Sequence, residues 1–253
     1  MSVTALRSAA EVLVATGHDP YARSSLRHSD VRGWVVAGAT AWVGVNPERG
    51  VVHVSSLGGC AQVGDLLGRL LPELRPRQRV TVPRGTPVHL PAWVGLGGAG
   101  QGRTDWDFRY VTAPPPEQHG EDRVEPTSDG PAVTALLAAA SPTASVLPGH
   151  PSVRRWVGVR DAGGALVACA ADTSSATGVG HLSSIAVAAG ARGDGLGKAV
   201  TASLTRSLLA DGMDLVTLGM YADNAAGKAL YDALGFVDEH RFSSGPLLVR
   251  GRW

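Results

Sequence analysis

The sequence predicts an α/β or α+β protein built from two domains. Strand-like and helix-like segments intermix along the chain, a proline-rich break divides it, and short motifs of the first part return in the second part. With 253 residues, of which 44% are apolar, the chain is long enough to form a core in each domain.

The break is the stretch Ala-Pro-Pro-Pro-Glu-Gln-His-Gly-Glu-Asp at residues 113–122. Its consecutive prolines favour an extended backbone, and its polar residues have no apolar surface to bury. We therefore expect a linker at residues 114–122, between one domain of residues 1–113 and another of residues 123–253.

The second part predicts a regular succession of elements. Val200, Leu204 and Leu208 recur at the spacing of one helix face, which predicts a helix over residues 196–209 that ends near Gly212. The remaining patterns predict helices at residues 130–140 and 225–234, strands at residues 155–160, 165–172, 180–188 and 215–221, and extended chain from residue 236 onward.

Three short segments indicate that the first part is a duplicate of the second. They recur in the same order and at nearly constant spacing, which is difficult to obtain by chance. Residues 31–35 resemble 153–157, residues 52–57 resemble 180–185, and residues 64–69 (Gly-Asp-Leu-Leu-Gly-Arg) resemble residues 193–198 (Gly-Asp-Gly-Leu-Gly-Lys).

A glycine-rich loop opens the helix predicted at residues 196–209. It is not a Walker A loop, because Arg192 stands where the first glycine is needed and Ala199 where the metal-binding hydroxyl is needed. It is not a dinucleotide fingerprint either, because Val200 stands in place of the third glycine. Such glycines still let backbone N–H groups turn inward beside a helix N-terminus, an arrangement that suits a pyrophosphate.

A second motif runs from residue 224 to 236 and reads Asn-Ala-Ala-Gly-Lys-Ala-Leu-Tyr-Asp-Ala-Leu-Gly-Phe. By itself it predicts a short helix with Asn224 as N-cap, Tyr231 as a core aromatic residue and Gly235 as C-cap. Together with the preceding loop, however, residues 123–253 resemble the GNAT acetyltransferase superfamily. The resemblance rests on the order of residues 184–187 (Ser-Ile-Ala-Val), 192–197 (Arg-Gly-Asp-Gly-Leu-Gly), the strand at 215–221, Asn224, Tyr231 and 234–236 (Leu-Gly-Phe).

The resemblance implies tandem GNAT-like domains, each a mixed, mostly antiparallel sheet flanked by helices. It also implies that an acetyl group passes from acetyl-CoA, as co-substrate, to a primary amine of a small molecule or of a peptide amino terminus by direct attack. Asn224 would contact the pantetheine arm of CoA or the adjacent splayed strand. Backbone groups of the strand would bind that arm, and those of the loop would bind the pyrophosphate: Ile185, Ala186, Val187, Arg192, Gly193, Asp194, Gly195, Leu196, Gly197 and Lys198. The Lys198 side chain is equally well interpreted as a solvated surface cation.

The resemblance also implies the catalytic residues. Tyr231 would also bind CoA, by pointing at its sulfur, and would protonate the departing thiolate as general acid. Family members often place a glutamate base on the strand before the loop, but residues 180–187 contain no carboxylate. His181 is the candidate base, with Asp172 on the neighbouring strand to orient it or to relay through water. The alternative, a partly buried strand residue without a catalytic role, stays open because His53 occupies the same place in the first part.

The first part departs from this pattern at the loop. Counting along the repeat, Val63 takes the place of Arg192, and Leu66 takes the place of Gly195, where a side chain would obstruct a ligand. Residues 91–98 are at most a remnant of the second motif, so we expect residues 1–113 to bind no CoA. Three tryptophans of this part line or cover an acceptor site, or belong to the core: Trp34, Trp42 and Trp106.

Composition argues against several other classes of protein. Cys60 and Cys169 lie far apart, so we expect neither a disulfide framework nor a metal site. A net charge of +1 argues against a nucleic-acid partner, and the lack of a signal peptide or long apolar segment predicts a cytoplasmic protein without a membrane partner. We expect a monomer or a homodimer. Two rival functions stay open: a non-catalytic acyl-CoA-binding sensor or regulatory module, and a non-enzymatic partner-binding protein.

Overall fold

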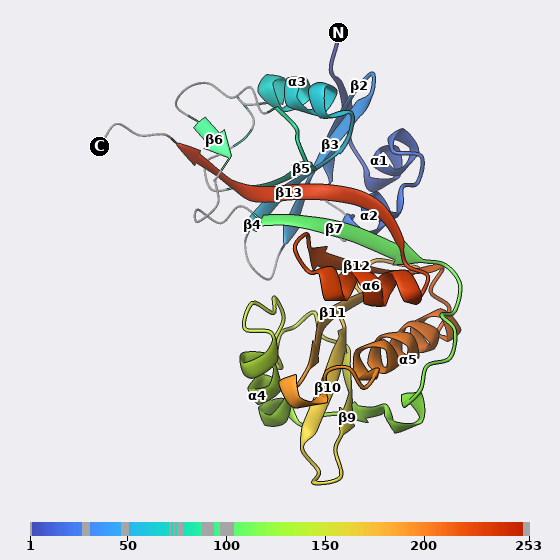
Figure 1. The fold of residues 1–253 in the computed structure, drawn as a ribbon. Coiled ribbons are helices and arrows are strands. Elements are labelled where there is room, and N and C mark those ends of the chain that lie inside the picture. The colour runs from blue at the N-terminus through green and yellow to red at the C-terminus, as the bar shows by residue number, and fades with distance from the viewer. Residues whose placement is uncertain are drawn as a thin grey trace. The chain divides into compact units, whose positions relative to one another are not determined.

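The chain forms two compact units in a computed structural model (Figure 1). Unit 1 comprises Met1–Phe108, Tyr221–Asp223 and Glu239–Trp253, and unit 2 comprises Arg109–Met220 and Asn224–Asp238. The structure describes residues 2–26, 31–46, 51–70, 72, 74, 78–87, 94–96 and 104–249.

Unit 1 is a mixed, mostly antiparallel sheet with helices. Its strands follow the order β1-β2-β3-β4-β5-β13, in which β4 and β5 run parallel and the other neighbours run antiparallel. Its elements are β1 (Thr4–Leu6), α1 (Ala9–Ala15), α2 (Pro20–Ser25), β2 (Arg32–Val36), β3 (Ala39–Asn46), β4 (Val51–Gly58), α3 (Cys60–Leu70), β5 (Arg79–Pro83), β6 (Val94–Leu96), the first residues of β7 (Thr104–Val111) and most of β13 (Val237–Val249).

Apolar residues hold α3 on one face of this sheet. Val63, Leu66, Leu67 and Leu70 recur at helical spacing and are buried in one cluster with apolar residues of β3, β4 and β5. A second group of side chains packs around the Tyr21 ring of α2, whose centroid lies 4.4 to 6.4 Å from those of its neighbours. These neighbours are Trp42, Trp106, Phe108, His240 and Phe242.

Unit 2 has the same kind of sheet, with β11 and β12 parallel. Its strands follow the order β12-β11-β10-β9-β8, and its core includes Val111 from the end of β7. Its elements are η1 (Glu121–Arg123), β8 (Glu125–Thr127), α4 (Gly130–Ala140), β9 (Arg155–Arg160), β10 (Leu166–Asp172), β11 (Val179–Val187), η2 (Ala189–Ala191), α5 (Leu196–Ala210), β12 (Leu215–Tyr221) and α6 (Ala225–Ala233).

The two long helices of unit 2 cover opposite faces of its sheet. Along β10, Ala168 and Ala170 are buried in the cluster that contains the α5 side chains, whereas Cys169 and Ala171 are buried in the cluster that contains the α4 side chains. This alternation is what the period of a strand requires when both faces are covered. Figure 1 accordingly shows α4 and α5 on either side of β10.

Both units repeat one order of elements, which supports the predicted duplication. A short strand, a helical segment (α1 and α2 in unit 1, α4 in unit 2), two antiparallel strands, a third strand, a helix and a parallel strand follow one another from β1 to β5 and again from β8 to β12. The predicted helices and strands of residues 130–236 are all present, with bounds that differ by at most one residue. The fold class expected from the sequence is therefore confirmed.

The third segment of the repeat is not equivalent in the two units. Residues 64–69 lie inside α3, which begins two residues after the last residue of β4, whereas residues 193–198 include a loop and only the first turn of α5. The interpretation that Leu66 replaces Gly195, and Val63 replaces Arg192, is therefore wrong. Both side chains point into the core of unit 1, because α3 needs them to cover its sheet.

The structure places residues 114–122 against a helix of unit 2, and its two compact units have other limits than the expected domains. Residues 114–122 lie against α5, where the Arg206 guanidinium pairs with the Glu121 carboxylate and donates to the carbonyl of Pro115. The first stretch of unit 1 ends at Phe108, and the chain returns to this unit at Tyr221–Asp223 and again from Glu239. Of the supposed remnant at residues 91–98, only β6 lies within the described residues.

Candidate functional site

The candidate site of unit 2 lies where β11 and β12 separate. Their parallel pairing runs from Val179 opposite Leu215 to Leu182 opposite Leu218, and none is found beyond these residues in the described part of the chain. β11 continues to Val187 and remains paired with β10 on its other side. The main chain of residues 183–187 is thus available on the β12 side, as the family resemblance implies for a strand that binds an extended arm.

A bulge redirects β11 within this separated part. Cys169 lies opposite Ala186 and Ala171 opposite Ser183, so that Ser184 and Ile185 together face one residue of β10. Ser184 has φ +50°, a strained conformation for a residue with a side chain, and its hydroxyl donates to the Val146 carbonyl at 2.7 Å. The bulge lies among the residues that the sequence assigns to CoA.

The glycine-rich loop has the geometry expected of an anion site. Gly193 and Gly195 adopt φ +94° and +78°, which favour glycine, and Gly195 is the N-cap of α5. No side chain caps this helix, and a Cβ at either glycine would meet no atom within 4 Å. N–H groups of the first turn and the positive end of the helix dipole therefore meet open space.

The other predicted loop residues surround this turn. The Arg192 guanidinium donates to the carbonyls of Val187 at 3.4 Å and Ala140 at 3.5 Å, which ties the loop to the ends of β11 and α4. Asp194 is exposed, whereas Leu196 is buried and Lys198 is partly exposed in the first turn of α5.

The first turn of α5 also contacts α6. A Cβ at Gly197 would lie 2.9 Å from Leu230 Cδ1 and 3.5 Å from Val187 Cγ2, so the helix start, α6 and the end of β11 meet at this glycine. Asn224 is the N-cap of α6, and its Oδ1 accepts a hydrogen bond from the Gly227 N–H at 2.8 Å. The loop and the tyrosine-bearing helix are therefore parts of one arrangement.

Tyr231 is buried on α6 in the core between the sheet, α5 and Phe236. Its ring centroid lies 5.8 Å from that of Phe236, and only 8% of the residue is exposed. Burial raises the pKa of the phenol to about 12, and the nearby Arg109 guanidinium opposes part of this rise. Arg109 is fully buried and pairs with the Asp232 carboxylate at 2.6 Å. Tyr231 thus keeps its proton at neutral pH.

His181 lies on β11 directly opposite Thr217 of β12. Two consecutive residues that follow β10 hold the backbone of His181: its N–H donates to Ser174 Oγ at 2.9 Å, and its carbonyl accepts from the Thr173 N–H at 2.9 Å. The ring nitrogen Nδ1 lies 2.8 Å from Thr217 Oγ1. His181 is partly buried, so its ring is neither sealed in the core nor fully solvated.

Asp172 was expected to orient His181, but its carboxylate has other partners. Its Oδ1 accepts from the N–H of Ser174 at 2.9 Å and from the Ser174 hydroxyl at 2.5 Å, and its Oδ2 lies 3.4 Å from Arg155 Nε. The Ser174 hydroxyl therefore links Asp172 to the backbone of His181, not to its ring. Thr217, which the sequence analysis did not single out, contacts the ring instead.

Unit 1 has a related histidine but a different surrounding. His53 Nε2 lies 2.7 Å from Thr81 Oγ1, and that hydroxyl lies 2.6 Å from Ser244 Oγ on β13. Trp34 and Trp42 are buried, which favours the core interpretation of both. Trp106 is partly exposed, and its indole N–H donates to Ser244 Oγ at 2.8 Å.

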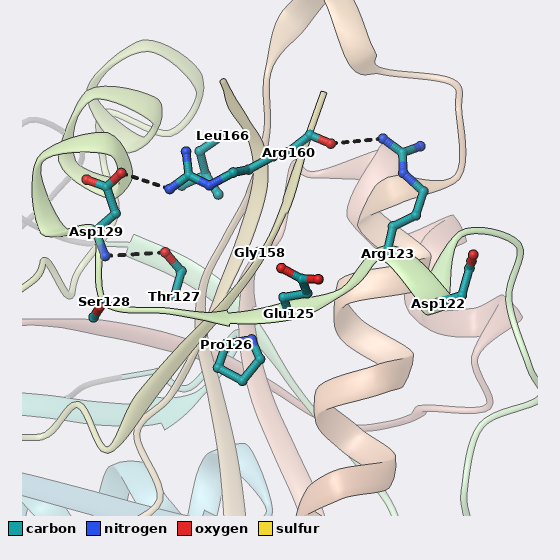
Figure 2. A pocket seen from close by; sticks show the side chains of 10 residues that line it. All are labelled: Asp122, Arg123, Glu125, Pro126, Thr127, Ser128, Asp129, Gly158, Arg160 and Leu166. Atoms are coloured by element: carbon teal, nitrogen blue, oxygen red, sulfur yellow. Dashed lines mark hydrogen bonds and ion pairs between the residues drawn. The ribbon is translucent and has the colours of Figure 1, made fainter. Parts of the chain in front are cut away.

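A hollow of about 550 Å³ lies at the β8 edge of unit 2 (Figure 2). Arg160 pairs with Asp129 at 2.8 Å across its rim, and Arg123 donates to the Arg160 carbonyl at 3.1 Å. Two strands, β9 and β10, separate β8 from β11 in the sheet order. The hollow is therefore distinct from the site between β11 and β12.

Among the described residues, no group of three or more His, Cys, Asp or Glu side chains is arranged to hold a metal ion. In the same part of the chain, no helix has the length and apolar character needed to cross a membrane.

Comparisons with known proteins identify the fold. The family model for FR47-like proteins, which are related to GNAT enzymes, matches residues 156–242. A search of curated proteins finds no match. A GCN5-related N-acetyltransferase from Sphaerobacter thermophilus aligns with a TM-score of 0.57 and 16% identity, over 99% of this chain and 96% of that one.

Two more solved structures agree with this result. A GNAT-family protein from Novosphingobium aromaticivorans aligns with a TM-score of 0.56 and 20% identity, over 94% of this chain and 96% of that one. A GCN5-related N-acetyltransferase from Kribbella flavida aligns with a TM-score of 0.51 and 19% identity, over 95% and 96% of the two chains. The chain thus has a GNAT fold, and the resemblance predicted for residues 123–253 is confirmed.

Proposed function

We propose that unit 2 transfers an acetyl group from acetyl-CoA to a primary amine of a small molecule or of a peptide amino terminus. The observation that carries this proposal is the continuity of three features in one unit: the separated edge of β11, the glycine loop that opens α5, and α6 with its buried tyrosine. Open space at Gly193 and Gly195 and the uncapped helix start fit a pyrophosphate.

The protein's residues have separate tasks in this reaction. N–H groups of the loop bind the pyrophosphate, and the main chain of Ile185, Ala186 and Val187 binds the pantetheine arm as an added strand. Bound acetyl-CoA supplies a thioester carbonyl carbon to which the amine nitrogen forms a bond while the carbon–sulfur bond breaks. His181 accepts the proton that the nitrogen loses, and Tyr231 gives its proton to the sulfur. The phenol holds its proton at neutral pH, as this role requires, while its pKa of about 12 makes it a weaker acid than an ordinary tyrosine.

A thiol-release assay with acetyl-CoA and a panel of amines tests the proposal. We expect turnover with at least one amine, and we expect Tyr231→Phe to lower kcat by about 10²-fold or more, the usual contribution of a positioned acid. The Kd of CoA measured by calorimetry should not change in this variant. Tyr110→Phe, which removes a phenolic hydroxyl elsewhere in unit 2, is the matched control and should keep full activity.

The results separate the proposal from its rivals. Binding of CoA without turnover of any amine would favour a sensor or regulatory module. The absence of CoA binding would reject acyl transfer and favour a partner-binding protein. Full activity of Tyr231→Phe would remove Tyr231 from the mechanism while leaving the transfer itself in place.

A further inference from the structure

The hydroxyl of Thr217 makes two hydrogen bonds, and its role as donor in one of them determines its role in the other. Its oxygen lies 2.9 Å from the Gly180 carbonyl and 2.8 Å from His181 Nδ1. A carbonyl can only accept, so the single hydroxyl hydrogen of Thr217 points at Gly180. At the other contact the hydroxyl oxygen must therefore accept, and His181 Nδ1 must carry a hydrogen.

We propose that Thr217 is a positioning residue that fixes His181 in the tautomer with Nδ1 protonated and the lone pair on Nε2. In the neutral ring only one nitrogen carries a hydrogen, and the other is the one able to take up a proton. This inference rests on the proposed function, in which His181 receives a proton from the amine nitrogen. It assigns that step to Nε2, whose N–H bond forms as the amine loses its proton.

The surroundings make Thr217 well suited to hold a ring in place. Thr217 is fully buried on β12, directly opposite His181 in the parallel pairing. Both backbone groups of His181 are bonded, to Ser174 and Thr173, and the parallel pairing of β11 with β12 fixes the strand relative to the Thr217 hydroxyl. A base held by an oriented partner is the arrangement that catalytic triads use on other folds.

Unit 1 offers an internal comparison, because it has a histidine and a threonine in the corresponding strands β4 and β5, with Thr81 opposite Ser55 and not opposite His53. There the contact joins His53 Nε2, not Nδ1, to Thr81 Oγ1. Thr81 also bonds Ser244, whereas Thr217 bonds a carbonyl of the strand that bears its histidine. The pair in unit 1 therefore does not impose the same tautomer.

Nitrogen-15 NMR of the histidine rings in the full-length protein tests the proposal directly. Multiple-bond ¹H–¹⁵N spectra show which ring nitrogen carries hydrogen, and His181→Gln identifies the signals by their loss. We expect Nδ1 protonated and Nε2 unprotonated in the neutral ring of the parent protein and of Thr217→Ser. In Thr217→Val, which has nearly the same shape, the hydrogen should redistribute to Nε2. Thr81→Val, the matched control, should leave the His181 signals unchanged.

Activity provides the second readout. We expect Thr217→Val to lower kcat about tenfold, part of the roughly 10²–10⁴ that a positioned base contributes, with the KM for acetyl-CoA unchanged and with Thr217→Ser restoring most of the rate. A parent ring with hydrogen on Nε2, or a tautomer unaffected by Thr217→Val, would overturn the proposal. So would a changed tautomer with undiminished kcat. The NMR result is independent of turnover, so a failure of acyl transfer would be recognised separately.

Discussion

The two strand-to-helix junctions of the duplicated fold differ in length and in what they leave open. In unit 2, residues 188–195 lie between β11 and α5. Two of the last three residues, Gly193 and Gly195, are glycines with positive φ. In unit 1, only Gly59 lies between β4 and α3. α3 thus starts at the end of its strand, and no residues remain to form a loop around an anion.

The parallel strands beside these junctions also differ between the units, in how firmly their ends are joined. Among the described residues, the pairing of β11 with β12 ends at Leu182 and that of β4 with β5 ends at Ser55, but in unit 1 the Ser56 hydroxyl donates to the Thr81 carbonyl at 2.8 Å and bridges the two strands beyond that point. Duplication has therefore kept the strands, their order and a buried core in both units. The features that suit CoA are found in unit 2. They lie in the loop between β11 and α5, whose glycines do not belong to the buried core.

The largest loss of stability that we expect from a single substitution is at Leu66, the residue that the sequence pattern equates with Gly195. Leu66 is fully buried in α3, so Leu66→Ala should lower the free energy of unfolding by about 2–5 kcal/mol through loss of packing. The affinity for CoA should stay unchanged, because the substitution lies in the core of unit 1. Denaturant unfolding and calorimetry measure the two quantities. Loss of CoA binding by a folded Leu66→Ala protein would contradict the separation of tasks between the units.

A smaller effect is expected from Tyr231, the buried phenol of α6. This helix has no counterpart after β5 in the described residues of unit 1. Tyr231 has a pKa of about 12 in the folded protein and an ordinary value near 10 when unfolded. The folded state therefore holds this proton more tightly, and stability should fall as pH rises from about 10 to 12, by about 2–3 kcal/mol in total. Below pH 10 the phenol makes no pH-dependent contribution.

Comparison with Tyr231→Phe isolates this contribution. The difference in unfolding free energy between the parent protein and Tyr231→Phe should be constant up to about pH 10 and then shift in favour of the variant. Parallel stability curves up to pH 11.5 would show that the phenol is not buried as described.

Much of unit 2 follows from local sequence signals, because its elements are set by periodicity and by turn residues. Val200, Leu204 and Leu208 define α5, and all three are buried in the unit 2 core. Asn224 caps α6, and Gly235 follows the end of α6 with φ +82°, as expected from their chemistry. These features depend on residues a few positions apart, so the sequence contains what is needed to predict them.

The remaining features depend on contacts between distant segments. The pairing of β13 with β5, in which Phe242 lies opposite Pro83, joins residues far apart in the chain and leaves no local pattern. The similarity of residues 64–69 to residues 193–198 is one of letters and not of structure, because Gly64 lies inside α3 where a Cβ would clash with the Pro87 carbonyl, whereas Gly193 has the positive φ of a loop. Thr217 had one available signal, the recurrence of Val-Thr-Val at residues 80–82 as Val-Thr-Leu at residues 216–218. Its position opposite His181 needed the strand register.

Calorimetric titration with CoA tests the central claim, that one junction of the duplicated fold binds this ligand. We expect one site per chain in the parent protein and at least a 100-fold weaker Kd in Gly195→Leu, because a side chain at φ +78° strains the loop and fills the space before α5. Gly164→Leu is the control, since Gly164 has φ +84° and equally open space in a turn of unit 2 away from the loop. This control should bind CoA like the parent protein. Two sites per chain, or unchanged affinity in folded Gly195→Leu, would contradict the claim.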